Sequence, residues 1–397
     1  MSLQILGILA FVFALLFSVM VHEAGHYLTA KRFGMKVTEF FVGFGRRIWS
    51  TQRGETEFGI KAIPAGGYCK IIGMTPDEPL SADEKPRAFI AGTIPQRLIV
   101  LGAGSFLHFV LGFILIFTLL SGIGISQTSS KIQSVSDCIP QSANEVCSAT
   151  STPSPAKSIG LQPGDRIVGI NGEKFKEWNK LRDALRAAPN QSVTLNIERN
   201  GQTLDLPVVL SAREVDGKKI GVLGVINAQE RNRLNPLVAI WRSVTITGEF
   251  FKASVAALFS LPSKIPQLIS ATFGNAERDP NGLVGVVGAA RIAGDAVGST
   301  LSFTDKLATF LLMIATLNIF VGIFNLLPLL PLDGGHMAIA IVDGVRNRRA
   351  ARKGLAKPAP LNVNRLMPVT VVVFAILVTL SVWLLAADLF NPVKINF

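Results

Sequence analysis

The chain has 397 residues, of which 49% are hydrophobic and 17% are charged, and its mean hydropathy is +0.42. A chain this apolar is not an ordinary soluble protein, and its length allows several membrane spans and a folded domain. The net charge of +12, from 39 Lys and Arg against 27 Asp and Glu, gathers beside the apolar segments. That pattern is typical of membrane topology and argues against nucleic-acid binding.

The first apolar segment, Leu3–Val21, runs directly into the motif His22-Glu23-x-x-His26. On a helix this spacing places two imidazoles one turn apart on one face, where they can share a Zn²⁺ ion. The glutamate between them can act as the general base for a water molecule. Ionisable groups inside membrane spans are rare unless they serve a site. The segment therefore predicts a zinc-dependent centre at membrane depth, and the alternative is a helix end with interfacial histidines.

A β-hairpin and a second span are predicted next. Residues 55–63 and 67–73 alternate as strands around a Pro-Ala-Gly-Gly turn. The apolar segment Leu98–Leu120, like the first one, is long enough to cross about 30 Å of hydrocarbon. Together these elements form a predicted N-terminal membrane core, residues 1–125.

The composition turns soluble over residues 126–228, where we predict an inserted α/β domain. Residues 160–172 read G-L-Q-P-G-D-R-I-V-G-I-N-G, which resembles the signature of PDZ domains in their circularly permuted form. This resemblance implies a groove between Ile132–Val135 and Leu181–Leu185, where a peptide could add as a strand. The alternative is a domain that binds no peptide and only obstructs bulky substrates.

Cys138 and Cys147 flank a short polar loop near the start of this domain. If the domain lies on the oxidising side of the membrane, we expect these two thiols to form a disulfide.

Residues 229–306 form a third predicted region. Within it, the apolar segment Leu237–Leu261 carries Arg242, Glu249 and Lys252 and is followed by two prolines. We expect an amphipathic helix that lies on the outer membrane surface and does not span.

The third long apolar segment, Leu307–Leu330, opens the C-terminal membrane core, residues 307–397, and leads into P-L-D-G-G-H. Its prolines break the helix near the inner boundary and the double glycine allows a tight turn, which presents Asp333 to the two imidazoles. A carboxylate is a competent third zinc ligand and leaves a fourth position for water. The alternative for Asp333 is a cap at a helix end.

Met367–Phe390 is the fourth predicted span, so we expect about four transmembrane helices. Lys and Arg concentrate after the first span, before the second, and between the third and fourth, and the positive-inside rule assigns these loops to the cytoplasm. Both termini and the long segment before the third span then lie outside. The first and third spans run in the same direction, so their C-terminal ends meet on the cytoplasmic side.

The two motifs resemble those of the site-2 protease family of intramembrane zinc metalloproteases, in its bacterial form with a single PDZ domain. The match rests on H-E-A-G-H at residues 22–26 and N-x-x-P-x-x-P-L-D-G-G at residues 325–335. The resemblance implies that His22, His26 and Asp333 bind zinc, and it favours Asp333 over His336. It also implies that Glu23 is the catalytic acid and base and that Asn325 holds substrate near the scissile bond.

One position departs from the family pattern. His108 lies where similar proteins often carry the asparagine of G-P-x-x-N. Two roles stay open for it: packing with a bond to a backbone carbonyl, or facing the site to stabilise an oxyanion.

The function that the resemblance implies is hydrolysis of a peptide bond in or near the transmembrane segment of a single-span protein. An anti-sigma factor already trimmed outside the membrane is the implied substrate, with the bacterial plasma membrane as the location. The hairpin could pair with the unwound substrate, which must be extended before attack. The competing hypotheses are a zinc-binding transporter or metal sensor, and a membrane-tethered PDZ adaptor with an inactive core.

Overall fold

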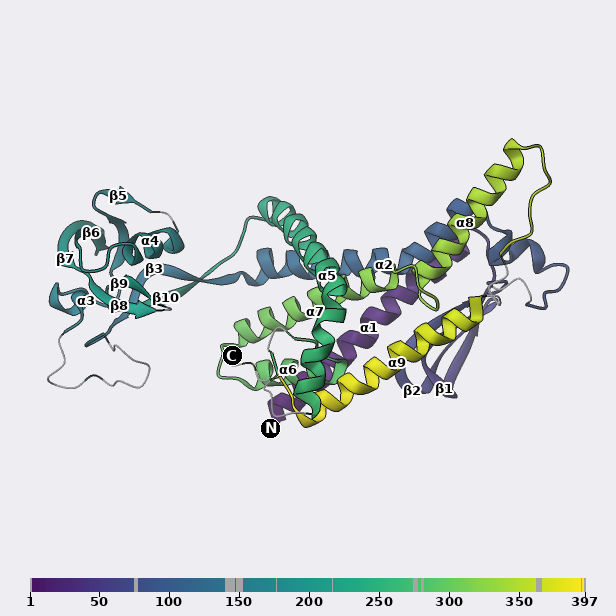
Figure 1. Ribbon diagram of the computed structural model, residues 1–397, viewed down its shortest axis with the longest axis horizontal. Helices are drawn as coiled ribbons and strands as arrows, with labels where there is room; N and C mark the ends of the chain where they lie inside the picture. Colours follow the sequence, from purple (N-terminus) through teal and green to yellow (C-terminus); the bar gives the residue numbers. More distant parts are fainter. Residues whose placement is uncertain are drawn as a thin grey trace. The chain divides into compact units, whose positions relative to one another are not determined.

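Figure 1 presents the computed structural model of the chain. The structure describes residues 2–74, 78–139, 147, 153–175, 177–215, 217–273, 278–279, 282–361, 366–393 and 395. The chain forms two compact units, one from Met1–Ile123 together with Leu234–Phe397 and the other from Gly124–Arg233.

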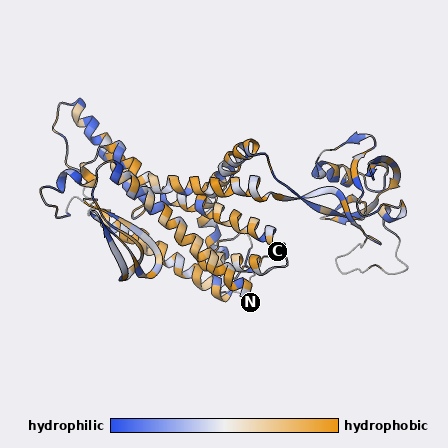
Figure 2. Cartoon of the chain, turned by 180° about the vertical axis from the view of Figure 1, so that it is seen from behind, coloured by the Kyte–Doolittle hydropathy of each residue, from blue (hydrophilic) through white to orange (hydrophobic). Residues whose placement is uncertain are grey.

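The first unit is built mainly of helices, and Figure 2 shows hydrophobic residues along most of their length. Among the described residues, five helices are long and apolar enough to cross a membrane, judged by length and composition. Each of the four predicted spans overlaps one of these helices, and α5 is the additional one. The helices are α1 (Ser2–Arg32), α2 (Ile94–Phe117, extended by a π-helical turn to Ile123), α5 (Pro236–Phe273), α6 (Val286–Gly298), α7 (Phe303–Asn325), α8 (Asp333–Arg352) and α9 (Met367–Phe390).

The region predicted as a separate surface segment, residues 229–306, differs from expectation. Helix α5 continues through Pro262 and Pro266 to Phe273, although proline removes a helical hydrogen bond. Phe251 of α5 lies 5.8 Å from Phe109 of α2, measured between ring centroids. Both α5 and α6 belong to the same compact unit as the other membrane helices. Ala290 and Ala293 of α6 pack in one cluster with Phe11 of α1 and Ile314 of α7.

Small residues allow α1, α2 and α7 to approach closely, as is common in membrane helix packing. A Cβ added to Gly25 of α1 would lie 2.7 Å from the Ala103 carbonyl oxygen of α2. A Cβ added to Gly112 of α2 would lie 2.9 Å from Ile319 of α7. Along α2, Val100 contacts His26 of α1 and Gly104 contacts His22, while His108 contacts Gly322 of α7 and Gly112 contacts Ala315. Helix α2 is therefore antiparallel to both helices, and α1 and α7 run in the same direction, as predicted.

A hairpin is present, but the predicted pairing of residues 55–63 with 67–73 is wrong. Nearly all of both segments, with the predicted turn between them, belong to the one strand β2 (Thr56–Ile71), which pairs antiparallel with β1 (Val37–Arg53). At its turn, Glu55 accepts hydrogen bonds from Arg87 at 2.7 and 2.8 Å and from Lys31 at 2.5 Å. The Arg87 guanidinium, assisted by Lys31, lowers the pKa of Glu55 to about 2. This carboxylate therefore stays ionised at neutral pH and ties the hairpin turn to the end of α1.

The second unit, Gly124–Arg233, is a small α/β domain, and the predicted domain covered residues 126–228. Its main sheet has the strand order β10-β3-β4-β6-β7, with Ile132, Ile167, Leu181 and Leu195 buried in the core. The elements are β3 (Ile125–Val135), α3 (Pro155–Ser158), β4 (Arg166–Ile170), β5 (Glu173–Lys174), α4 (Trp178–Arg186), β6 (Ser192–Arg199), β7 (Gln202–Val209), β8 (Ser211–Val215), β9 (Lys218–Val222) and β10 (Val225–Asn232).

Two expectations for this unit can be compared with the structure. Cys138 and Cys147 form a disulfide, so that prediction is confirmed. The predicted peptide groove used Ile132–Val135, which lie in β3 and pair with β10 on one side. The strands that end the main sheet are β10 and β7. The peptide groove stays a prediction.

A buried ion pair joins the C-terminal helix to the segment before α6. Arg278 donates to Asp388 of α9 at 2.8 Å, and the Gly288 backbone N–H donates to the same carboxylate at 2.8 Å. The side chains of Arg278 and Asp388 are 3% and 0% exposed. Removing one partner leaves the other charge buried and unpaired.

We therefore expect Asp388→Ala to lower the free energy of unfolding by about 3–5 kcal/mol. The double variant Asp388→Leu with Arg278→Met is expected to recover most of this loss, because no charge is then left unpaired. Unfolding in a denaturing detergent measures both variants. A single variant as stable as the double variant would contradict the expectation.

Candidate metal centre

The two imidazoles of the H-E-x-x-H motif meet on one face of α1. His22 and His26 are 6% and 8% exposed, and their Nε2 atoms lie 3.0 Å apart. The four-residue spacing produces this arrangement because residues i and i+4 are neighbours on a helix surface. The motif lies within the apolar helix, about two to three turns before its end at Arg32.

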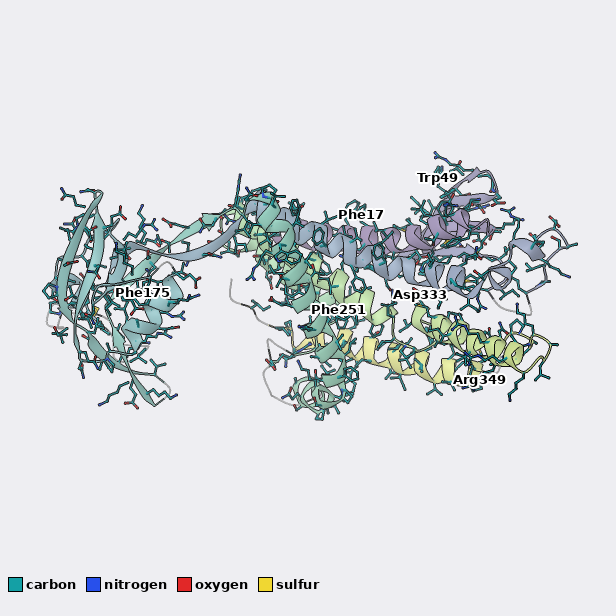
Figure 3. The ribbon with its side chains drawn as sticks, turned by 90° about the horizontal axis from the view of Figure 1, so that it is seen from above. Phe17, Trp49, Phe175, Phe251, Asp333 and Arg349 are labelled. Carbon is teal, nitrogen blue, oxygen red and sulfur yellow. A yellow bond between two sulfur atoms is a disulfide. The ribbon has the colours of Figure 1, made fainter. Side chains whose placement is uncertain are left out.

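Asp333 completes the cluster from the other end of the chain. It is the first residue of α8, and Figure 3 labels it at the junction of α7 and α8. Its Oδ2 atom lies 3.1 Å from His22 Nε2 and 3.4 Å from His26 Nε2. The N-cap position of α8 is occupied by Leu332, so the carboxylate of Asp333 faces the imidazoles and does not cap the helix.

The double glycine after Asp333 allows a close backbone approach. A Cβ on Gly334 would collide with the carbonyl groups of Leu326 and Leu327. A Cβ on Gly335 would lie 2.6 Å from the backbone of Leu329. Both glycines belong to the first turn of α8, so the predicted tight turn is in fact a helix start pressed against the preceding loop.

The geometry of these three residues fits a tetrahedral zinc ion. Ligand atoms at about 2.1 Å from a tetrahedral metal lie about 3.4 Å from one another. The three observed separations are 3.0, 3.1 and 3.4 Å. The donor set of two imidazoles and one carboxylate is also one that zinc uses in catalytic sites, with a fourth position left open.

The orientation of His26 suits a metal ligand. Its Nδ1 atom lies 2.8 Å from the Val100 carbonyl oxygen of α2, which can only accept a hydrogen bond. Nδ1 therefore carries the hydrogen, and Nε2 presents a lone pair to the cluster. Such an outer hydrogen bond fixes the ring orientation of metal-binding histidines.

The other predicted site residues lie around this cluster. Glu23 is half-buried on α1, and a Cβ added to Gly67 of β2 would lie 3.7 Å from its Cγ atom. The hairpin therefore passes beside the glutamate. Asn325 is the last residue of α7 and is half-buried. His336 is half-buried on α8 and is not a member of the cluster formed by His22, His26 and Asp333.

His108 faces the cluster from α2. It is 2% exposed, and its ring centroid lies 5.0 Å from that of His22. Its Nδ1 atom bonds to the Asn318 side-chain oxygen at 2.8 Å, so the expected bond to a backbone carbonyl is not the contact observed. Asn318 and its partner Ser18 were not predicted, although polar residues inside apolar spans are a usable signal.

Gly104 of α2 gives His22 the space it occupies. A Cβ at this position would lie 2.5 Å from His22 Cε1 and 2.6 Å from His22 Nδ1. We expect Gly104→Ala to displace the imidazole, to destabilise the protein by about 1–3 kcal/mol, and to weaken metal binding.

Gly102→Ala is the matched control, because its Cβ would meet only the end of Met337, at 3.8 Å. Thermal unfolding and the metal retained after dialysis compare the two variants. If both variants unfold at the same temperature and retain the same amount of metal, the close contact between Gly104 and His22 affects neither stability nor metal binding, which contradicts the expectation.

The chain matches known proteins over nearly its whole length. The family model described as peptidase family M50 matches residues 10–359. The zinc metalloproteases Rip1 of Mycolicibacterium smegmatis and of Mycobacterium tuberculosis are each 34% identical over 98% of this chain and 98% of their own length. The solved PDZ domain of the SdrC-like protein from Listeria monocytogenes covers 26% of this chain and 92% of its own, with 19% identity and a TM-score of 0.20.

Proposed function

The chain belongs to peptidase family M50, and from this premise we propose which of its residues carry out intramembrane zinc proteolysis. It is a zinc metalloprotease, as are its relatives of 34% identity. We assign His22, His26 and Asp333 as the zinc ligands. The observation that carries this assignment is the cluster of three ligand atoms, all within 4.8 Å of one another, beside an apolar helix.

Glu23 acts as the catalytic acid and base. Zinc bound at the cluster would polarise the scissile carbonyl and acidify the attacking water. Glu23 takes a proton from this water as its oxygen bonds to the carbonyl carbon. It then returns the proton to the amide nitrogen as the carbon–nitrogen bond breaks, which gives one carboxylic acid and one amine. Asn325, at the end of α7, holds the substrate near the scissile bond.

The substrate is a membrane protein with a single span, of the anti-sigma factor type and already trimmed outside the membrane. A peptide bond within a helix is shielded, so the substrate segment must be extended before it is attacked. The hairpin supports this step, because β2 passes beside Glu23 at Gly67. An extended substrate segment that pairs with the hairpin would deliver its backbone to the catalytic glutamate.

The Gly124–Arg233 unit acts as a PDZ domain with a preference for acidic peptides. A cavity of about 400 Å³ lies between α4 and the residues that lead into β10. Arg182, Arg186 and Arg213 line this cavity, and β10 offers an unpaired strand edge. A peptide with carboxylate side chains would complement these arginines while its backbone extends the sheet.

The membrane arrangement that we propose places both termini and the Gly124–Arg233 unit outside the cytoplasm, in a bacterial plasma membrane. The charge pattern supports it, since Lys and Arg concentrate after α1 and along the second half of α8. The disulfide between Cys138 and Cys147 also favours an oxidising side for this unit.

The competing hypotheses are not favoured. A transporter or metal sensor would have no need of Glu23. The zinc metalloproteases that this chain resembles match it over 98% of both chains. An inactive adaptor would have no reason to keep the glutamate between two clustered imidazoles.

The test is cleavage of a labelled single-span substrate in proteoliposomes. A zinc chelator is expected to abolish cleavage, and added Zn²⁺ is expected to restore it, because the metal activates the water. Cleavage that continues after complete removal of the metal would refute the proposed function. Zinc movement across the vesicle without any cleavage would instead support the transporter hypothesis.

A further inference from the structure

We propose that His108 is a positioning residue for His22 and accepts a hydrogen bond from His22 Nδ1–H through its own Nε2 atom. The inference rests on the proposed role of His22 as a zinc ligand. It assigns a specific function to the histidine that departs from the family pattern in α2.

The side-chain amide of Asn318 has a defined orientation. Its side-chain nitrogen donates to the Ile314 carbonyl oxygen at 2.8 Å and to Ser18 Oγ at 3.1 Å. A carbonyl oxygen can only accept, so the nitrogen of the amide group must face Ile314. Both amide hydrogens are then used, and the remaining oxygen of Asn318 faces His108.

This orientation fixes the hydrogen on His108. The Asn318 oxygen can only accept, and it lies 2.8 Å from His108 Nδ1, so this nitrogen carries the hydrogen. A neutral imidazole has one N–H group, and its other nitrogen is an acceptor. His108 therefore presents Nε2 as an acceptor in a setting where its side chain is 2% exposed.

His22 needs a hydrogen-bond acceptor at its Nδ1 atom. Its Nε2 atom faces Asp333 and His26, so a metal ligand at this position must carry its hydrogen on Nδ1. Nδ1 is buried and has no hydrogen-bond partner among the described residues. A buried donor without an acceptor is unfavourable by about 1–3 kcal/mol.

The two rings are at the right separation for this bond. Their centroids are 5.0 Å apart and their planes are inclined by 39°. An N–H···N bond of about 2.9 Å between two imidazoles places the centroids about 5 Å apart. The separation of the two rings is therefore compatible with this bond.

With this bond, α2 provides a hydrogen-bond acceptor for each of the two imidazoles. It provides the Val100 carbonyl oxygen for His26 and the His108 ring for His22. The chain from Ser18 through Asn318 and His108 to His22 then has one donor and one acceptor at every contact, which orients the ring that faces the metal.

Ser105 is the rival acceptor. It follows Gly104, which lies against His22, and its buried hydroxyl has no partner among the described residues. A serine hydroxyl rotates freely about its C–O bond, so it holds a ring less firmly than a second imidazole does. This makes Ser105→Ala the matched control for variants of His108.

The experiment measures the zinc dissociation constant of the full-length protein in detergent, by competition with a chromogenic chelator. His108→Phe removes the acceptor, and the more flexible His108→Met leaves only the weak acceptor of a thioether sulfur, so that one folded variant is available. Each is expected to weaken zinc binding by about 10–100-fold, as loss of an outer hydrogen bond to a metal ligand does. His108→Gln, which keeps an acceptor oxygen, is expected to recover part of the affinity, and Ser105→Ala is expected to match the wild type.

Thermal unfolding of each metal-free variant shows whether the fold is kept. Wild-type affinity in a folded His108→Phe or His108→Met variant would overturn the inference. An equal loss in Ser105→Ala would also overturn it, because the acceptor would then not be His108. A wild-type protein that binds no zinc at all would instead refute the proposed function, so the two failures are distinguishable.

Discussion

Replacement of Glu23 by glutamine is expected to lower kcat by about 10²–10⁴-fold and to leave the zinc content unchanged. Glutamine has nearly the same shape but cannot take a proton from water. Glu23 is not part of the cluster of His22, His26 and Asp333, so the metal keeps all three protein ligands. Cleavage of a labelled single-span substrate in proteoliposomes, with metal analysis of the same preparation, gives both quantities.

Glu249→Gln is the matched control, because it makes the same chemical change at an exposed position of α5. This variant should cleave at the wild-type rate. If Glu23→Gln also cleaves at that rate, another group takes the proton and the assignment of Glu23 is wrong. If Glu23→Gln loses its zinc, the effect on kcat says nothing about proton transfer, and the separation of base from ligands that we infer is refuted.

The cluster could be predicted because each of its members carries a local signal. His22 and His26 have helical spacing at the end of an apolar segment, and Asp333 follows an apolar segment interrupted by prolines. The direction of the two segments could be predicted as well, since it follows from the alternation of spans and charged loops. These signals depend on sequence spacing and hydropathy alone.

The contacts behind the cluster could not be predicted in the same way. Ser18 and Asn318 are single polar residues in apolar helices, and their partners depend on how each helix is rotated about its axis. Hydropathy does not determine this rotation when a helix is apolar on all sides. The space that Gly104 leaves for His22 likewise depends on how closely α1 and α2 approach each other.

The lengths of α5 and α8 could not be predicted from the sequence either. The prolines of α5 suggested an end at Leu261, yet the helix continues to Phe273 because membrane helices tolerate proline when other groups satisfy the freed backbone. The basic segment before the last span suggested a charged loop, but most of it forms the second half of α8. Local charge indicates on which side of the membrane a segment lies, but it does not determine the secondary structure of that segment.

Loss of the Asp333 carboxylate is expected to weaken zinc binding by about 100-fold or more, since even an outer hydrogen bond to a ligand contributes 10–100-fold. Asp333→Ala removes the only oxygen ligand of the cluster and leaves two imidazoles for the metal. Cleavage should fall in parallel with the zinc content. Metal analysis after dialysis against a weak chelator measures the first quantity, and the proteoliposome assay measures the second.

His336→Ala distinguishes the two ligands that the D-G-G-H sequence offers. His336 lies one turn after Asp333 on α8 but is outside the cluster of ligand atoms, so this variant should keep its zinc. Because the first turn of α8 is pressed against Leu326 and Leu327, a shift of the helix that brings His336 to the metal would require these backbones to separate. If Asp333→Ala kept its zinc and His336→Ala lost it, His336 and not Asp333 would be the third zinc ligand. Helix α8 would then have to shift in this way.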